Sequence, residues 1–107
     1  MADIEWDRQF ALEQACDDEE MLRELLALLR DSSRADLERI RKGVAAGDGE
    51  AAGEAAHSIK GAAASLGMAG LSRLAYEMEK AGMAGDLGRV ETLLPELARM
   101  LGQLPTS

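Results

Sequence analysis

The chain has 107 residues, and its formal net charge of −8 argues against nucleic acid or an anionic membrane as its partner. No apolar run approaches the roughly 20 residues that span a bilayer, and a single cysteine, Cys16, excludes an internal disulfide. One histidine and one cysteine also leave too few ligands for a typical zinc site. Because Ala, Leu, Glu and Arg are abundant and aromatic residues are scarce, we expect residues 1–107 to form one all-α domain. The lack of a membrane-spanning run and of a signal-peptide pattern at Met1 predicts a cytoplasmic protein.

The N-terminal half is predicted to contain a short helix followed by a long one. Residues 3–15 carry Trp6 and Phe10 one turn apart, which predicts a short helix whose aromatic rings cover one end of the core. Cys16 follows as an expected small buried hydrophobe. The long helix, 18–46, has an N-cap at Asp17 or Asp18 and a core-facing stripe that comprises Leu22, Leu26, Leu29, Ser33, Leu37, Ile40 and Val44. The polar Ser33 makes Asp31-Ser32-Ser33 a candidate kink.

The C-terminal half is predicted to contain three further helices. Asp48 caps the first of them, 49–65, and Gly67 and Gly70 mark the turn into the next, 69–82. Asp86 caps the last, whose apolar stripe continues to Leu104. Pro95 lies inside that stripe, so it should kink the helix or begin its second half.

Four long amphipathic segments joined by short turns predict an antiparallel up-down-up-down four-helix bundle, with the short N-terminal helix across one end. No further apolar face is evident, so we expect a monomer.

The only histidine, His57, lies in the third of these five segments on the side away from the core. The core-facing stripe there comprises Ala52, Ala55, Ala56, Ile59, Ala62, Ala63 and Leu66. At about 100° per residue, His57 lies roughly 160° from Ile59, and the outer face also includes Gly53, Lys60, Gly61 and Ala64.

The residues around His57 favour a group carried on its ring. A helix-interior glycine costs about 1 kcal/mol relative to alanine, so glycines one turn before and after His57 indicate clearance for another molecule. Lys60 supplies a positive charge where an anion on His57 would lie. Between His57 and Tyr76 the charged residues are Lys60 and Arg73, which favours an acidic partner at this place. A phosphoryl group fits this description.

The turn at Gly67 allows the heights of residues on the two adjoining helices to be compared. His57 lies about 15 Å before the turn, and Tyr76 and Glu79 lie about 13–18 Å after it, at 1.5 Å per residue. Glu79 is therefore a candidate to accept a hydrogen bond from one ring nitrogen, which would fix the tautomer. A solvated surface acid is an equally good interpretation of Glu79 from spacing alone.

These residues resemble the histidine-containing phosphotransfer (HPt) domain family. Its pattern His-x-x-Lys-Gly-x-x-x-x-x-Gly is matched by His57, Lys60, Gly61 and Gly67. Less specific similarity covers nearly the whole chain. Related domains often have a polar residue at position 79 that hydrogen-bonds the histidine, whereas position 76 is variable.

The resemblance implies a phosphorelay. A receiver domain carrying a phosphoaspartate would dock at the third and fourth helices, transfer its phosphoryl group to His57, and a second receiver would accept it. Lys60 would neutralise charge and Gly61 would provide clearance, while Mg²⁺ is expected on the receiver and no cofactor on this chain. The sequence has no Gly-rich phosphate loop, so we expect a carrier without its own ATP site and not an enzyme.

Other functions remain open at this point. The bundle could be an adaptor whose histidine is never phosphorylated, a phosphohistidine phosphatase, or the dimerising half of a sensor kinase. It could also be the excised phosphotransfer domain of a hybrid or chemotaxis kinase. A start at Met1 and an end near the last helix suit a stand-alone protein, but a cloned fragment would look the same.

Overall fold

The computed structural model describes residues 3–107 and confirms the all-helical prediction. Five helices and no β-strand occur within that range. They are α1 (Arg8–Gln14), α2 (Glu19–Ala45), α3 (Gly49–Ser65), α4 (Ala69–Met83) and α5 (Leu87–Leu101). The molecule is elongated, with principal extents of 43 × 23 × 19 Å.

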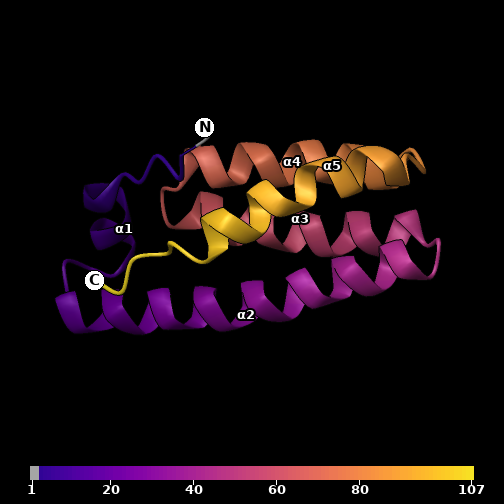
Figure 1. The fold of residues 1–107 in the computed structure, drawn as a ribbon. Coiled ribbons are helices and arrows are strands. Elements are labelled where there is room, and N and C mark those ends of the chain that lie inside the picture. The colour runs from indigo at the N-terminus through magenta and orange to yellow at the C-terminus, as the bar shows by residue number, and fades with distance from the viewer. Residues whose placement is uncertain (1–2) are drawn as a thin grey trace.

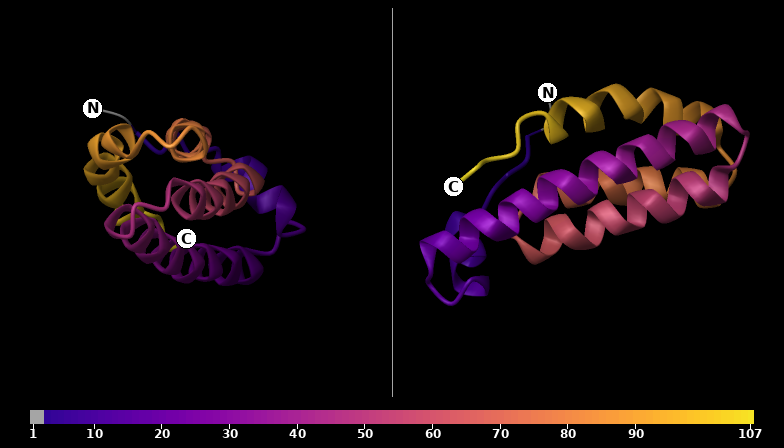
Figure 2. Two further views of the ribbon diagram at one scale, coloured as in Figure 1. Left: turned by 90° about the vertical axis from the view of Figure 1, so that its right-hand side faces the viewer. Right: turned by 90° about the horizontal axis from the view of Figure 1, so that it is seen from below.

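The four longer helices pack into a bundle around one core. Helix α3 contacts α2 and α4, and α5 contacts α4 and α2, so the contacts form a closed ring. The α3–α4 pair has the most extensive contacts. Figure 1 shows α2, α3 and α4 side by side along the long axis, with α5 crossing in front and α1 at one end. The end-on view in Figure 2 shows the four longer helices grouped together.

Three of the four longer helices begin where an aspartate caps them, as the sequence predicts; α4 begins after Met68 without a side-chain cap. The carboxylate of Asp18 accepts hydrogen bonds from the backbone N–H groups of Glu20 and Met21 at the start of α2. Asp48 and Asp86 do the same for the first turns of α3 and α5. These bonds satisfy backbone donors that have no partner inside the helix.

The predicted first helix over 3–15 is too long. Helix α1 begins at Arg8 because the carboxylate of Asp7 accepts a hydrogen bond from the backbone N–H of Phe10. The preceding segment is non-helical and pairs with the α3–α4 turn. The Asp7 N–H donates to the carbonyl of Gly67 at 2.8 Å, and the Gly70 N–H donates to the carbonyl of Ile4 at 2.9 Å. These long-range bonds replace the local bonds of a helix.

The two aromatic residues near the N-terminus, Trp6 and Phe10, are not fully buried in the core. The Trp6 indole N–H donates to the carbonyl of Leu66 at 3.0 Å, and its ring packs against the core. Phe10 is exposed over 38% of its surface. The expectation that both rings cover the end of the core therefore holds for Trp6 and is wrong for Phe10.

Cys16 is exposed, which contradicts the prediction that it is buried. Cys16 and Asp17 have φ angles of 56° and 60°, in the left-handed region, and form the tight connection between α1 and α2. This connection lies outside the core, so the cysteine faces solvent.

The two predicted irregularities do not break their helices. Helix α2 continues through Asp31-Ser32-Ser33, with Ser33 buried on its inner face. Helix α5 continues through Pro95, which is exposed, and ends at Leu101, three residues earlier than predicted. Gly102 follows as the C-cap.

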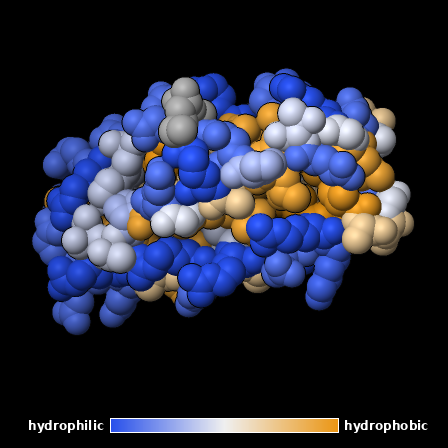
Figure 3. Space-filling model, in the orientation of Figure 1, coloured by the Kyte–Doolittle hydropathy of each residue, from blue (hydrophilic) through white to orange (hydrophobic). Residues whose placement is uncertain are grey.

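The core consists mainly of aliphatic and methionine side chains from α2 to α5, with Ile4, Ala11 and Ala15 added from the N-terminal end. Its largest fully buried members are Leu22, Leu26, Ile40, Ile59, Met68, Leu71, Met78, Val90, Leu97 and Met100. Figure 3 shows that hydrophobic residues also reach the surface beside α5, toward the end of the bundle away from α1. No helix within residues 3–107 has both the length and the apolar character that crossing a bilayer requires.

Candidate functional site

The His57 side chain projects from the middle of α3 with 63% of its surface exposed. Ile59, on the other side of the same helix, is fully buried. The outward orientation follows from the helical period, because α3 places Ala55, Ala56 and Ile59 in the core. The imidazole is therefore accessible to another macromolecule.

Glu79 on α4 lies beside the histidine. Its Oε2 atom is 2.8 Å from Nδ1 of His57, and its Oε1 atom accepts a hydrogen bond from Nζ of Lys60 at 2.6 Å. Gly67, with φ of 75°, forms the turn that brings α3 and α4 to the same level. One carboxylate thus bridges His57 and Lys60, the two motif residues of α3 that have polar side chains.

Glu79 is shielded but charged. Its side chain is only 17% exposed, yet its pKa lies below the ordinary value of 4.5. The hydrogen bond from Lys60 is the largest cause; desolvation by burial opposes it, and the hydrogen bond from His57 adds to it. Because a carboxylate has no proton to give, the hydrogen shared with His57 belongs to Nδ1. In the neutral ring, Nε2 then has the free lone pair.

Gly53 and Gly61, one turn before and one turn after His57, have different environments. A Cβ atom on Gly61 would meet no atom within 4 Å, so the surface one turn after the histidine is open. Gly53 is buried, and a Cβ there would lie 3.1 Å from the backbone nitrogen and two side-chain atoms of Met83. The prediction that Gly53 clears space around His57 is therefore wrong: its missing side chain admits α4.

Lys60 has a second neighbour that was not anticipated. Its Nζ atom lies 5.0 Å from the ring centroid of Tyr76, and Nζ of Lys80 lies 4.7 Å from the same centroid. Spacing alone placed Tyr76 near the height of His57 and said nothing of Lys80. The i, i+4 separation of Tyr76 and Lys80 on one helix was the available signal.

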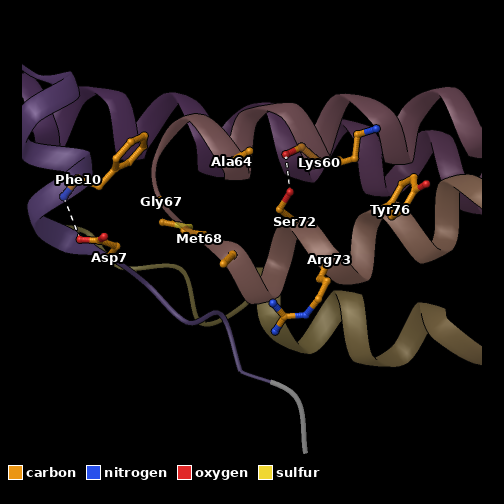
Figure 4. Close-up of a pocket in the computed structure, with 10 residues that line it drawn as sticks. Asp7, Phe10, Lys60, Ala64, Gly67, Met68, Ser72, Arg73 and Tyr76 are labelled. Atoms are coloured by element: carbon orange, nitrogen blue, oxygen red, sulfur yellow. Dashed lines mark hydrogen bonds between the residues drawn. The ribbon is translucent and has the colours of Figure 1, made fainter.

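A pocket of about 660 Å³ adjoins Lys60 and extends toward α1. Phe10, Ala64 and Met68 contribute apolar surface to it. Figure 4 shows Lys60 and Tyr76 at the end of the pocket opposite Phe10, and the Ser72 hydroxyl donating to the Lys60 carbonyl, a distance of 3.1 Å. Arg73 also lines the pocket but is paired with Glu5, so its charge is partly neutralised.

Metal ligands do not gather at this site. Within residues 3–107, no group of three or more His, Cys, Asp or Glu side chains is arranged to hold a metal ion.

A helical bundle that presents one exposed histidine, oriented by a carboxylate and flanked by a lysine, has the features of a carrier that holds a group on an imidazole nitrogen. The model of the Hpt domain family matches residues 24–107, so the chain belongs to that family of histidine phosphotransfer proteins. Proteins of this family carry phosphoryl groups and are not catalytic enzymes.

The fold is also that of a solved structure from this family. The crystal structure of histidine-containing phosphotransfer protein B (HptB) from Pseudomonas aeruginosa PAO1 superposes with a TM-score of 0.85 and 24% sequence identity. The alignment covers 94% of this chain and 87% of that one. At this identity the likeness establishes the fold. A comparison with curated protein sequences finds no significant match.

Proposed function

We propose that this protein relays a phosphoryl group between the aspartates of two receiver domains and that His57 Nε2 is the acceptor atom. The observation that carries the proposal is the 2.8 Å contact between Nδ1 and Glu79 on a ring that is 63% exposed. That contact leaves Nε2 as the available nucleophile. The Hpt family match supports the same chemistry.

The transfer step follows from this tautomer. The Nε2 lone pair attacks the phosphorus of the phosphoaspartate, the P–Nε2 bond forms, and the bond from phosphorus to the aspartate oxygen breaks. The aspartate leaves as a carboxylate, and the imidazole becomes a phosphorylated, positively charged ring that keeps its proton on Nδ1. Glu79 stabilises that positive charge as it develops, because it is already oriented toward Nδ1. The second transfer reverses these changes.

The other residues of the site have supporting roles in this proposal. Lys60 Nζ neutralises charge on the phosphoryl oxygens, and Gly61 leaves room for the receiver. Mg²⁺ is expected on the receiver and not on this chain. With receiver domains as partners, we expect a monomeric protein acting in the cytoplasm.

The proposal also includes the antiparallel up-down-up-down arrangement. Residues 46–48, 66–68 and 84–86 are the only connections between consecutive long helices, and each consecutive pair is in contact. Short connections between packed helices favour antiparallel neighbours.

The test is phosphoryl transfer from a ³²P-labelled receiver domain to the wild-type protein and to His57→Gln. We expect acid-labile, base-stable label on the wild type and none on the variant. Circular dichroism should show unchanged helicity in His57→Gln, because the side chain is exposed. Label retained on the variant would contradict the proposal. Absence of label on a folded wild type, with every receiver tried, would favour an adaptor.

A further inference from the structure

We propose that Tyr76 is a positioning residue that holds the Lys60 ammonium beside the phosphoryl-accepting histidine through its aromatic ring. The inference rests on the proposed function. It starts from the 5.0 Å separation between Lys60 Nζ and the Tyr76 ring centroid, a distance at which a cation is attracted to an aromatic face.

The position of Tyr76 is not explained by core packing. The residue is 46% exposed, while its neighbours Ala75 and Met78 on the same helix are fully buried. The chain has one Trp, one Tyr and one Phe, so an aromatic ring at the edge of this site is a distinctive feature. The ring instead contacts cations from two helices, Lys60 on α3 and Lys80 on α4.

The Tyr76 ring can attract the Lys60 ammonium without the full negative charge that Glu79 carries. Glu79 attracts Lys60 through a full negative charge, and it also has to serve His57 Nδ1. When the ring of His57 becomes positively charged during transfer, the two cations share one carboxylate. An aromatic face attracts the ammonium without carrying a net charge, so it repels an incoming phosphoryl group much less than a second carboxylate would. Lys60 can then remain near His57 while it turns toward that group.

Lys80 extends the same arrangement. Its Nζ atom lies 4.7 Å from the Tyr76 centroid and 3.0 Å from Oε1 of Glu77. The ring therefore lies close to two ammonium groups, one of which shares Glu79 with the histidine, on a chain whose net charge is −8. Without the ring, Lys60 would be held by Glu79 alone and Lys80 by Glu77 alone.

The experiment compares Tyr76→Phe, which keeps the aromatic ring, with Tyr76→Leu, which removes it, each in the wild-type and Lys60→Ala backgrounds. The first readout is the single-turnover rate of transfer at several receiver concentrations. In the wild-type background, Tyr76→Leu should lower the maximal rate about two- to fivefold, the effect that one exposed cation–π contact can have. Tyr76→Phe should transfer at the wild-type rate. In the Lys60→Ala background, Tyr76→Leu should cause no further loss.

The second readout is independent of transfer. The Lys60 Hε resonances in the ¹H–¹³C NMR spectrum of the protein alone should be shifted upfield by the ring current in the wild type and in Tyr76→Phe. They should return to ordinary lysine positions in Tyr76→Leu.

Several outcomes would overturn the inference. An equal loss of rate in both backgrounds would mean that Tyr76 does not act through Lys60. A raised half-saturating receiver concentration with an unchanged maximal rate would make Tyr76 a docking residue. A labelled wild type with an unaffected Tyr76→Leu variant would overturn this inference alone, whereas a wild type that accepts no label would overturn the proposed function and this inference together.

Discussion

At the scale of single residues, Glu79 connects the chemistry of the site to its stability. Its carboxylate contacts both His57 and Lys60, and its side chain is 17% exposed. The hydrogen bonds lower its pKa below 4.5 in the folded protein, so the folded state favours the ionised form more than the unfolded state does. Stability from this group is therefore present above about pH 4.5 and is lost as the pH falls through the lower folded value.

The substitution Glu79→Gln should make this pH dependence visible. At neutral pH the variant should unfold at a lower urea concentration than the wild type, because the ionised group is gone. The difference should shrink as the pH falls below about 4.5, because the unfolded wild type then takes up a proton on this carboxyl more readily than the folded state does. Urea titrations across that range measure it. Glu54→Gln, an exposed position on α3, controls for removal of a surface carboxylate; a pH-independent difference for Glu79→Gln would contradict the linkage.

Gly61 allows stability and transfer to be separated. Its Cβ position is open, so Gly61→Gln should raise the free energy of unfolding by up to about 1 kcal/mol through helix propensity. The same side chain, one turn from His57, should slow transfer on the order of tenfold by displacing the receiver. Urea unfolding and the ³²P assay measure the two effects. Gly88→Gln, exposed on α5, is the matched control and should leave transfer unchanged. Unimpaired transfer in Gly61→Gln would show that clearance there is unnecessary.

At the scale of elements, the α3–α4 pair depends on glycines facing each other across the interface. A Cβ on Gly82 would lie 2.7 Å from the carbonyl oxygen of Gly49 and 2.7 Å from the backbone nitrogen of Gly53. These contacts are with backbone atoms, which cannot rotate away. The helices that present His57 and Glu79 are thus held closely together near the end that joins α4 to α5.

The substitution Gly82→Ala should therefore destabilise the protein, although alanine is the better helix former. Overpacking at such a contact costs about 1–3 kcal/mol of unfolding free energy. Thermal unfolding followed by circular dichroism measures it, with Gly88→Ala as a control that should not destabilise. An unchanged or higher melting temperature for Gly82→Ala would mean that α3 and α4 can separate without cost.

At the scale of the whole molecule, the N-terminal segment joins parts of the chain that are far apart in sequence. The Trp6 indole N–H donates to the carbonyl of Leu66 across 60 residues, and the backbone of Asp7 donates to Gly67. Both bonds reach the α3–α4 turn, which sets the relative height of His57 and Glu79. The N-terminal segment thus stabilises the turn between α3 and α4, the two helices that carry the site.

The substitution Trp6→Phe should cost about 1 kcal/mol of unfolding free energy, because it removes the indole donor and leaves the Leu66 carbonyl without that partner. Since Trp6 is the only tryptophan, unfolding has to be followed by circular dichroism. Phosphoryl transfer should change little, because Trp6 does not contact His57. A wild-type urea midpoint would show that the hydrogen bond contributes nothing.

Some features were predictable because their causes are local. The starts of α2, α3 and α5 follow from Asp18, Asp48 and Asp86, whose carboxylates bond backbone groups two or three residues away. The outward direction of His57 follows from the period of one helix. The role of Gly53 was not predictable, because α3 contacts both α2 and α4 and therefore buries a wider surface than one stripe. Helical spacing alone does not indicate which neighbour covers which side.

The sequence by itself determined that the protein is helical, where its longer helices begin, and that a lone histidine followed by Lys60 and Gly61 faces outward, since each depends on residues within a few positions. Only the tertiary structure decided how α3 and α4 meet. Their packing brings Glu79 to His57 Nδ1, brings Lys60 over the Tyr76 ring, and makes residues 4–7 a non-helical partner of the α3–α4 turn. These contacts join residues from different elements, and their distances are set by the packing of whole helices.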